Sequence, residues 1–369
     1  MANELLISAL NQIAEHVEVE NKKHYWMVRT DNGINYDTFS VEGFVALNLN
    51  DYPTQFLSKL EHDYPDVNTR IPHIKRELIE LNKKGRITLN FNEGERPFKS
   101  SIGRLANQIA SMAYIIKRGD IVLIPDHGAN RIKIGKIIDD CLYIRKNDNR
   151  FSYARKVEWL KEIRKTRLDP CLYKALGAHQ AICDITKYSE YVERNYNSFF
   201  NIDDKYHYVL AVNAENISAW KLSNMVYDIL YCVKNISEEN NLGINIEEIN
   251  FTINVNSPGK FSFITTAKNA ALIMAVVAAL SGGNIKYTEF EATTNGLFPN
   301  LVECINTWKN AEQEREQKAQ LFNLFINSLE VKTIEAANEA YEAVAAEEDD
   351  DEEEFIEEDD ENENREEIE

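Results

Sequence analysis

The spacing of apolar residues predicts a series of strands and helices over the first 165 residues. Apolar residues at every second position, or in short unbroken runs, predict strands, and apolar residues three or four positions apart predict helices. Helices are expected at 72–84, where Ile74, Leu78 and Leu81 share one face, and at 100–116. Strands are expected at 24–30, 41–49, 120–124, 131–138, 141–146, 150–157 and 156–160. Several short strands with two inserted helices predict a small mixed β-barrel over residues 22–165.

The remaining chain has a different order of elements. An amphipathic helix is expected within residues 1–21, with Leu6, Leu10, Ile13 and Val17 on one face. Residues 166–205 are expected to form a helical connector. Strand and helix patterns then mix over 206–344, which predicts a second α+β domain of unknown type. Its elements are expected at 207–212, 219–233, 249–255, 260–265, 270–280, 284–291 and 297–344, with a hairpin turn at 256–259.

Charge is distributed unevenly along this α+β chain. The whole chain carries a formal charge of −20, but residues 347–369 hold 17 carboxylates and one arginine. Residues 70–168 contain 23 Lys and Arg against 11 Asp and Glu, a net charge of +12. The tail from 345 to 369 has almost no apolar residues, so it is expected to be disordered. The barrel region is therefore a basic module, and its charge suits a nucleic-acid partner.

The spacing of cysteines and histidines indicates which cell compartment and which metal sites to expect, and hydropathy indicates whether a membrane span is expected. Five cysteines are scattered without CxxC spacing, which favours a reducing cytoplasm over disulfides or zinc. The seven histidines show no HxH or HExxH spacing, so no metal or other cofactor is expected. The start of the chain lacks the basic segment and cleavage site of a signal peptide. The apolar run at 270–280 is too short to cross a bilayer, and a buried core helix is expected instead.

Several short motifs in the basic region resemble one protein family. HYWMVRTDNGINYDTF, VEGFVALNL, KRGDIVLIPDHGANRIKIGKI and FSYARKVEWL occur in this order within residues 22–165. Together they resemble the N-terminal PUA/EVE-like barrel of Mrr-type prokaryotic restriction and phage-defence proteins. The resemblance implies recognition of RNA or DNA, including modified bases held in a pocket with aromatic walls. It thus implies a nucleic-acid recognition protein of a restriction or anti-phage system, with DNA or RNA bound through residues 70–168.

The chemistry of nucleic-acid binding selects two sets of residues. Phosphates are neutralised by Lys and Arg, and bases stack on aromatic rings. The candidate phosphate-binding residues are Lys117, Arg118, Arg131, Lys133, Arg145, Lys146, Arg150 and Arg155. The candidate base-stacking residues are Trp26, Tyr143, Tyr153 and Trp159. The alternatives are that the cations form an ordinary solvent-exposed strand face and that the tryptophans belong to the core.

Catalytic motifs are less evident. Asp126 and His127 are adjacent in a loop, and adjacent side chains diverge, so a polar hairpin is favoured over an acid–base pair. A Mrr-type nuclease needs an Asp and a Glu-x-Lys triplet that hold a divalent metal ion. Glu330-Val331-Lys332 has these letters but is expected in a helix, and Asp203-Asp204-Lys205 precedes its strand. A metal-dependent restriction-type nuclease therefore stays as an alternative function without identified catalytic residues.

Two further hypotheses concern the C-terminal part. The helices there could bind a protein partner, with the 270–280 helix acting on that partner or on a membrane, although membrane contact is not expected from its length. The acidic tail at 347–369 either keeps the protein soluble or mimics nucleic-acid phosphate and competes for the basic module.

Overall fold

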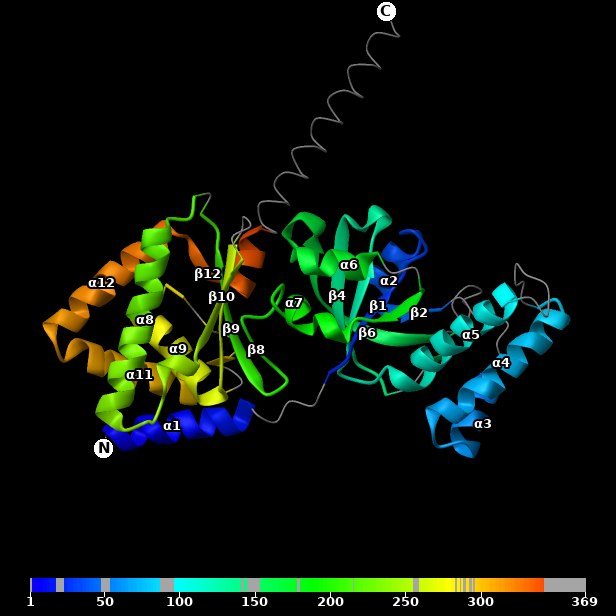
Figure 1. The fold of residues 1–369 in the computed structure, drawn as a ribbon, viewed down its shortest axis with the longest axis horizontal. Helices are drawn as coiled ribbons and strands as arrows, with labels where there is room; N and C mark the ends of the chain where they lie inside the picture. Colours follow the sequence, from blue (N-terminus) through cyan, green and yellow to red (C-terminus); the bar gives the residue numbers. More distant parts are fainter. Residues whose placement is uncertain are drawn as a thin grey trace, which may run out of the picture. The chain divides into compact units, whose positions relative to one another are not determined.

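The chain has an α+β fold that divides into two compact units. The computed structural model describes residues 2–17, 23–47, 54–86, 96–140, 143–144, 153–177, 180–214, 216–254, 259–282, 284–285, 287, 290–291, 294 and 296–341. The half-barrel unit comprises residues 22–195, and the terminal unit comprises residues 1–21 and 196–369 (Figure 1). The expected disordered tail at 345–369 lies outside the described residues.

The half-barrel unit is built on a curled sheet that mixes parallel and antiparallel neighbours. Its described strands lie in the order β2-β6-β4-β3-β1-β7, and β5 pairs with β6. Only β1 and β3 are parallel among these described pairs, and the chain between them contains β2 and several inserted helices. The strands are β1 (Tyr25–Val28), β2 (Phe44–Ala46), β3 (Ile121–Pro125), β4 (Arg131–Ile137), β5 (Tyr143–Ile144), β6 (Tyr153–Arg164) and β7 (Ile182–Asp184).

Helices between the strands differ in detail from the sequence-based expectation. Residues 41–49 were expected to be a strand, but α2 (Tyr36–Glu42) occupies the first part and β2 contains only three residues. Asp66 caps α4 (Val67–Lys83) by accepting a hydrogen bond from Asn68, so that helix begins before Pro72. The next helix was expected to begin at residue 100, but α5 (Arg96–Ala110) begins earlier and continues into the π-helix η1 (Ser111–Ile115). With α3 (Thr54–Asp63), α4 and α5 bury a small apolar core of their own.

The helical connector expected at 166–205 is wrong in extent and content. Residues 166–195 belong to the half-barrel unit, where β7 pairs with β1. The helices described in and directly before this segment are all short: η3 (Lys165–Arg167), η4 (Pro170–Leu172), α6 (Tyr173–Leu176), η5 (Thr186–Tyr188) and α7 (Ser189–Glu193). Buried Glu193 accepts a hydrogen bond from the Tyr25 hydroxyl at 2.6 Å and ties this segment to β1.

The terminal unit combines an antiparallel sheet with a helical layer. The described strands lie in the order β10-β11-β9-β12, and β8 pairs with β9. These strands are β8 (Phe199–Ile202), β9 (Lys205–Val212), β10 (Asn250–Asn254), β11 (Gly259–Thr265) and β12 (Val331–Thr333). The main core lies between this sheet and the helices α1 (Ala2–Val17), α8 (Ala219–Asn240), α9 (Ala267–Leu280), α11 (Leu297–Asn310) and α12 (Gln313–Ser328). The short η6 (Ile246–Glu248) precedes β10.

Two elements of the terminal unit test the expectations directly. Every described residue of α9 except Lys268 is buried, which confirms the expected core helix, and its apolar side chains pack in the core of the terminal unit. No described helix is long and apolar enough to cross a membrane. The strand expected at 284–291 is wrong, because the described residues there are irregular or helical. Ile285 and Tyr287 are nevertheless buried, which explains the apolar pattern.

Candidate functional site

The carboxyl ends of the two parallel strands define one edge of the half-barrel sheet. Because β1 and β3 run in the same direction, Arg29 and Thr30 after β1 lie beside Pro125 and Asp126 at the end of β3. The Thr30 hydroxyl donates a hydrogen bond to the Pro125 carbonyl at 2.5 Å and joins the two strand ends. Ligands of α/β proteins commonly bind outside the carboxyl ends of parallel strands, where the following loops diverge.

Both loops at this edge turn sharply through left-handed backbone. After β1, Asp31, Asn32 and Gly33 have φ angles of 54°, 55° and 93°. After β3, Gly128 and Ala129 have φ angles of 69° and 56°. Left-handed turns keep both loops short.

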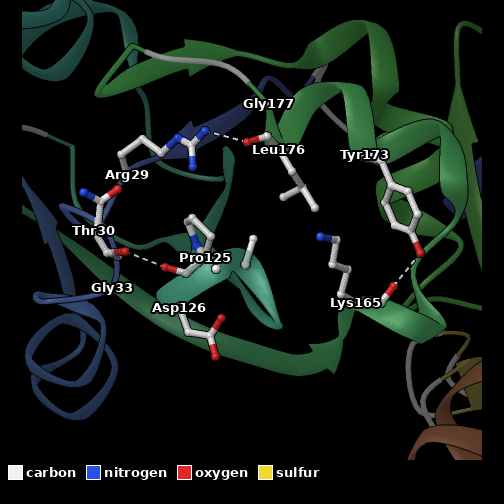
Figure 2. Close-up of a pocket in the computed structure, with 12 residues that line it drawn as sticks. Arg29, Thr30, Gly33, Pro125, Asp126, Lys165, Tyr173, Leu176 and Gly177 are labelled. Atoms are coloured by element: carbon white, nitrogen blue, oxygen red, sulfur yellow. Dashed lines mark hydrogen bonds between the residues drawn. The ribbon is translucent and has the colours of Figure 1, made fainter.

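These loops form one wall of a pocket of about 400 Å³ (Figure 2). Its volume lies within the range of small-ligand sites. The lining residues come from the two strand ends and the loops after them, from the start of η3 directly after β6, and from α6 and its C-cap: Arg29, Thr30, Asn32, Gly33, Pro125, Asp126, Gly128, Ala129, Lys165, Tyr173, Leu176 and Gly177. All of them belong to the half-barrel unit.

Two cations and one aromatic ring give the pocket its chemistry. The Lys165 side chain extends into the pocket, and its ammonium nitrogen lies 5.8 Å from the centre of the Tyr173 ring (Figure 2). The Tyr173 hydroxyl donates to the Lys165 carbonyl at 2.9 Å, which fixes the ring although Tyr173 is 41% exposed. Arg29 Nη2 donates to the Leu176 carbonyl at 2.5 Å. This bond holds the guanidinium along another wall of the pocket.

Asp126 supplies the carboxylate of the pocket, and Arg131 holds it in place. The Asp126 Oδ1 atom accepts from the Arg131 backbone N–H at 2.8 Å, and Oδ2 accepts from Arg131 Nε at 3.1 Å. His127 is exposed, and the Asp126 carboxylate contacts Arg131. The expected polar hairpin therefore describes this loop better than an acid–base pair does.

The outward face of β4 carries compensated charge, which the sequence did not reveal. Arg131 and Lys133 both lie within 4.0 Å of the Glu162 carboxylate on β6. Lys133 also donates a hydrogen bond to the Ser40 hydroxyl, and the Tyr36 hydroxyl donates to Glu162 at 2.6 Å. Burial and this hydrogen bond raise the pKa of Tyr36 far above its ordinary value. Arg131 and Lys133 thus belong to a network that already balances much of their charge.

Two candidate residues, Arg155 and Trp26, are buried, and a third, Trp159, is half-buried. Arg155 is 1% exposed, and its Nε donates to Asp139 Oδ1 at 2.8 Å, so it is a buried ion pair and no surface cation. Trp26 is 4% exposed and donates its indole N–H to buried Asp120 at 2.9 Å. Trp159 is half-buried and donates to the Phe39 carbonyl at 3.1 Å. Trp26 belongs to the core, Trp159 packs against that core, and each indole N–H has an internal partner.

The other candidates divide into exposed residues and residues outside the described part. Lys117 and Arg118 are exposed on the turn before β3, and Arg118 lies 3.7 Å from Asp140. Arg145, Lys146 and Arg150 lie outside the described residues, as do the side chains of Tyr143 and Tyr153. The pocket residues Arg29, Lys165 and Tyr173 were missed. Finding them requires the parallel pairing of β1 with β3, and nothing in the local pattern signals it.

The described residues provide no metal site for the alternative function as a nuclease. Glu330-Val331-Lys332 was expected in a helix, but Glu330 occupies a left-handed turn after α12 and the next two residues begin β12. Asp203 and Asp204 have φ angles of 50° and 62° and form the two-residue turn of the β8–β9 hairpin. Within the described residues, no group of three or more His, Cys, Asp or Glu is placed to hold a metal ion.

Comparison with known proteins gives one match. A family model described as a domain of unknown function (DUF8426) matches residues 75–186, about three tenths of the chain. No curated protein and no solved structure matches the chain. The matched segment includes β3, β4, β6 and β7 and the pocket residues Lys165 and Tyr173, but it excludes the loop that carries Arg29.

Proposed function

We propose that the half-barrel unit binds DNA or RNA and holds one nucleotide in the pocket between Arg29, Lys165 and Tyr173. The observation that carries this proposal is the combination of two cations and one aromatic ring around a cavity of about 400 Å³. A nucleotide joins an anionic phosphate to a flat base, and this pocket offers complementary groups for both parts.

Each pocket group has a role in this proposal. Lys165 and Arg29 attract a phosphate, because Lys and Arg supply the electrostatic part of nucleic-acid affinity. The exposed Tyr173 ring provides a face on which a base can stack. Asp126 and the carbonyls of the two loops accept hydrogen bonds from amino groups on a base edge. A modified base would be distinguished by the fit of its added group to the pocket wall.

The surroundings support the same function. Residues 70–168 carry a net charge of +12, and Lys117 and Arg118 are exposed within them, although Arg118 lies 3.7 Å from the exposed Asp140 carboxylate. The motifs that resemble Mrr-type defence proteins lie within the half-barrel unit. We therefore propose recognition of nucleic acid in a prokaryotic restriction or anti-phage system, acting in the cytoplasm. The acidic tail at 347–369, outside the described residues, is proposed as a competitor for the basic surface.

Fluorescence anisotropy with the full chain tests the proposal. Plain and base-modified DNA duplexes, single strands and RNA are titrated at several salt concentrations. We expect salt-sensitive binding at micromolar protein, and absence of such binding to every probe would refute the proposal. Lys165→Gln and Tyr173→Ala are each expected to weaken binding by about tenfold.

A matched control separates the pocket from general surface charge. Lys174 is exposed on the same helix as Tyr173 but does not line the pocket. Lys174→Gln removes the same charge as Lys165→Gln and is expected to change affinity by less than about twofold. Equal losses in the two lysine variants would argue for diffuse charge attraction and against a nucleotide in the pocket.

A further inference from the structure

The β10 strand forms an end of the sheet in the terminal unit. Among the described strands, β11 is the neighbour of β10, and the order β10-β11-β9-β12 places β10 at the edge. An edge strand presents backbone N–H and C=O groups to which another strand can pair. Natural proteins protect such edges with charged residues, proline or bulges. The five residues of β10, NFTIN, contain neither a charge nor a proline.

Apolar side chains on β10 extend the core to this edge. Phe251 lies opposite Phe263, and Ile253 lies opposite Phe261. Both phenylalanines of β11 are fully buried, whereas Phe251 is 37% exposed and Ile253 is 45% exposed. The Phe251 ring lies 5.4 Å from the Phe263 ring, centre to centre. The apolar layer of the sheet therefore continues onto β10 and is incompletely covered there.

The residue order of β10 is self-complementary about Thr252. In an antiparallel pair of two β10 strands centred on Thr252, Asn250 pairs with Asn254, Phe251 with Ile253, and Thr252 with Thr252. Pairs of aromatic with β-branched residues, and of threonine with threonine, stabilise antiparallel sheets. No like charges meet at any position of this register. This self-complementary order favours a second copy of the same strand as the occupant of the β10 edge.

We propose that a second copy of this chain pairs with β10 in antiparallel orientation, with Thr252 of both copies at the two-fold axis. The two sheets then form one continuous sheet through main-chain hydrogen bonds. A two-fold interface of this kind uses the same surface on both copies and stops at the dimer. The short strand predicts a reversible dimer that is observed at micromolar concentrations and above.

Complementary charges at Thr252 provide the sharpest test, with the full chain throughout. Sedimentation equilibrium is expected to show the wild type shifting from 42.5 kDa to about twice that mass as its concentration rises. Thr252→Lys and Thr252→Glu each place like charges face to face, so each is expected to raise the dimer dissociation constant by at least about tenfold. An equimolar mixture of the two variants is expected to restore the dimer, because lysine then faces glutamate.

Controls identify the other outcomes. Leu324 is a 63% exposed apolar residue on α12, outside β10, and Leu324→Lys is expected to leave the dimer intact. Hydrogen exchange of the wild type gives a readout without substitution, since the amides of β10 are expected to gain protection as protein concentration rises. A wild type that stays monomeric, a dimer insensitive to both Thr252 variants, a mixture that does not associate, or loss of the dimer in Leu324→Lys would each overturn the proposal.

Discussion

Gly33 and His127 approach each other so closely that a side chain at position 33 would collide with the backbone of His127. A Cβ atom on Gly33 would lie 2.6 Å from the His127 Cα and 2.8 Å from its Cβ. Gly33 belongs to the loop after β1, and His127 belongs to the loop after β3. The contact therefore fixes the distance between the two loops that form one wall of the pocket.

Gly33→Ala is expected to destabilise the protein by about 2–4 kcal/mol, because the left-handed backbone and the collision with His127 both oppose a side chain. Gly119→Ala is the matched control: Gly119 has a φ of 92°, but a Cβ there would meet nothing within 4 Å. The control is expected to lose only about 1 kcal/mol. Urea unfolding measures both, and equal losses would show that backbone strain alone accounts for the effect.

Arg155→Leu is expected to reduce stability by about 3–5 kcal/mol, because it leaves the Asp139 carboxylate without its buried partner. The affinity of the folded variant for nucleic acid should remain that of the wild type, since Arg155 does not reach the surface. Urea unfolding and anisotropy titrations measure the two properties separately. If the variant were fully folded but bound nucleic acid more weakly, Arg155 would have to belong to the interface.

The double variant Lys117→Gln, Arg118→Gln should keep the stability of the wild type but change its binding of nucleic acid. Both side chains are exposed, so the free energy of unfolding should change by less than about 0.5 kcal/mol. If they contact phosphates, the slope of log affinity against log salt should decrease by about two. An unchanged slope would exclude this turn from the proposed interface.

Removal of residues 347–369 tests the competing tail. The deletion removes a net charge of −16 and is expected to tighten nucleic-acid binding and to steepen its salt dependence. Anisotropy titrations at low salt, where charge attraction is strongest, give the clearest comparison with the full chain. If affinity at low salt does not change, the tail is not a competitor.

Stability at alkaline pH should depend on Tyr36. Burial and the hydrogen bond to Glu162 raise the pKa of Tyr36, so the folded state retains a proton that the unfolded chain loses near pH 10. This contribution is complete below about pH 10 and decreases as pH rises further. Tyr36→Phe should lose about 1 kcal/mol at pH 8 and show a shallower decline between pH 10 and 11. Urea unfolding across this range measures the decline, and parallel curves for the two proteins would contradict the assignment.

Local patterns in the sequence determined the type and approximate position of most elements. The spacing of Ile74, Leu78 and Leu81 predicts the buried face of α4, and the alternation of Ile132 and Ile134 with Arg131 and Lys133 predicts β4. Such patterns are informative because neighbouring residues on one helix face or strand face share one environment. The α+β class and the buried character of the 270–280 helix follow from the same reasoning.

Only the tertiary structure decided which cations are buried or paired and which are exposed. The sequence does not distinguish Arg155, Arg131 and Lys133 from the exposed cations Lys117 and Arg118. In the structure, Arg155 is buried against Asp139, and Arg131 and Lys133 are both paired with Glu162. The pocket brings Arg29 together with Lys165 and Tyr173, more than 130 residues further along the chain. That meeting depends on the parallel pairing of β1 with β3 and on the return of residues 166–195 to the sheet. Local periodicity reports the environment of a residue, but long-range pairing determines its partners.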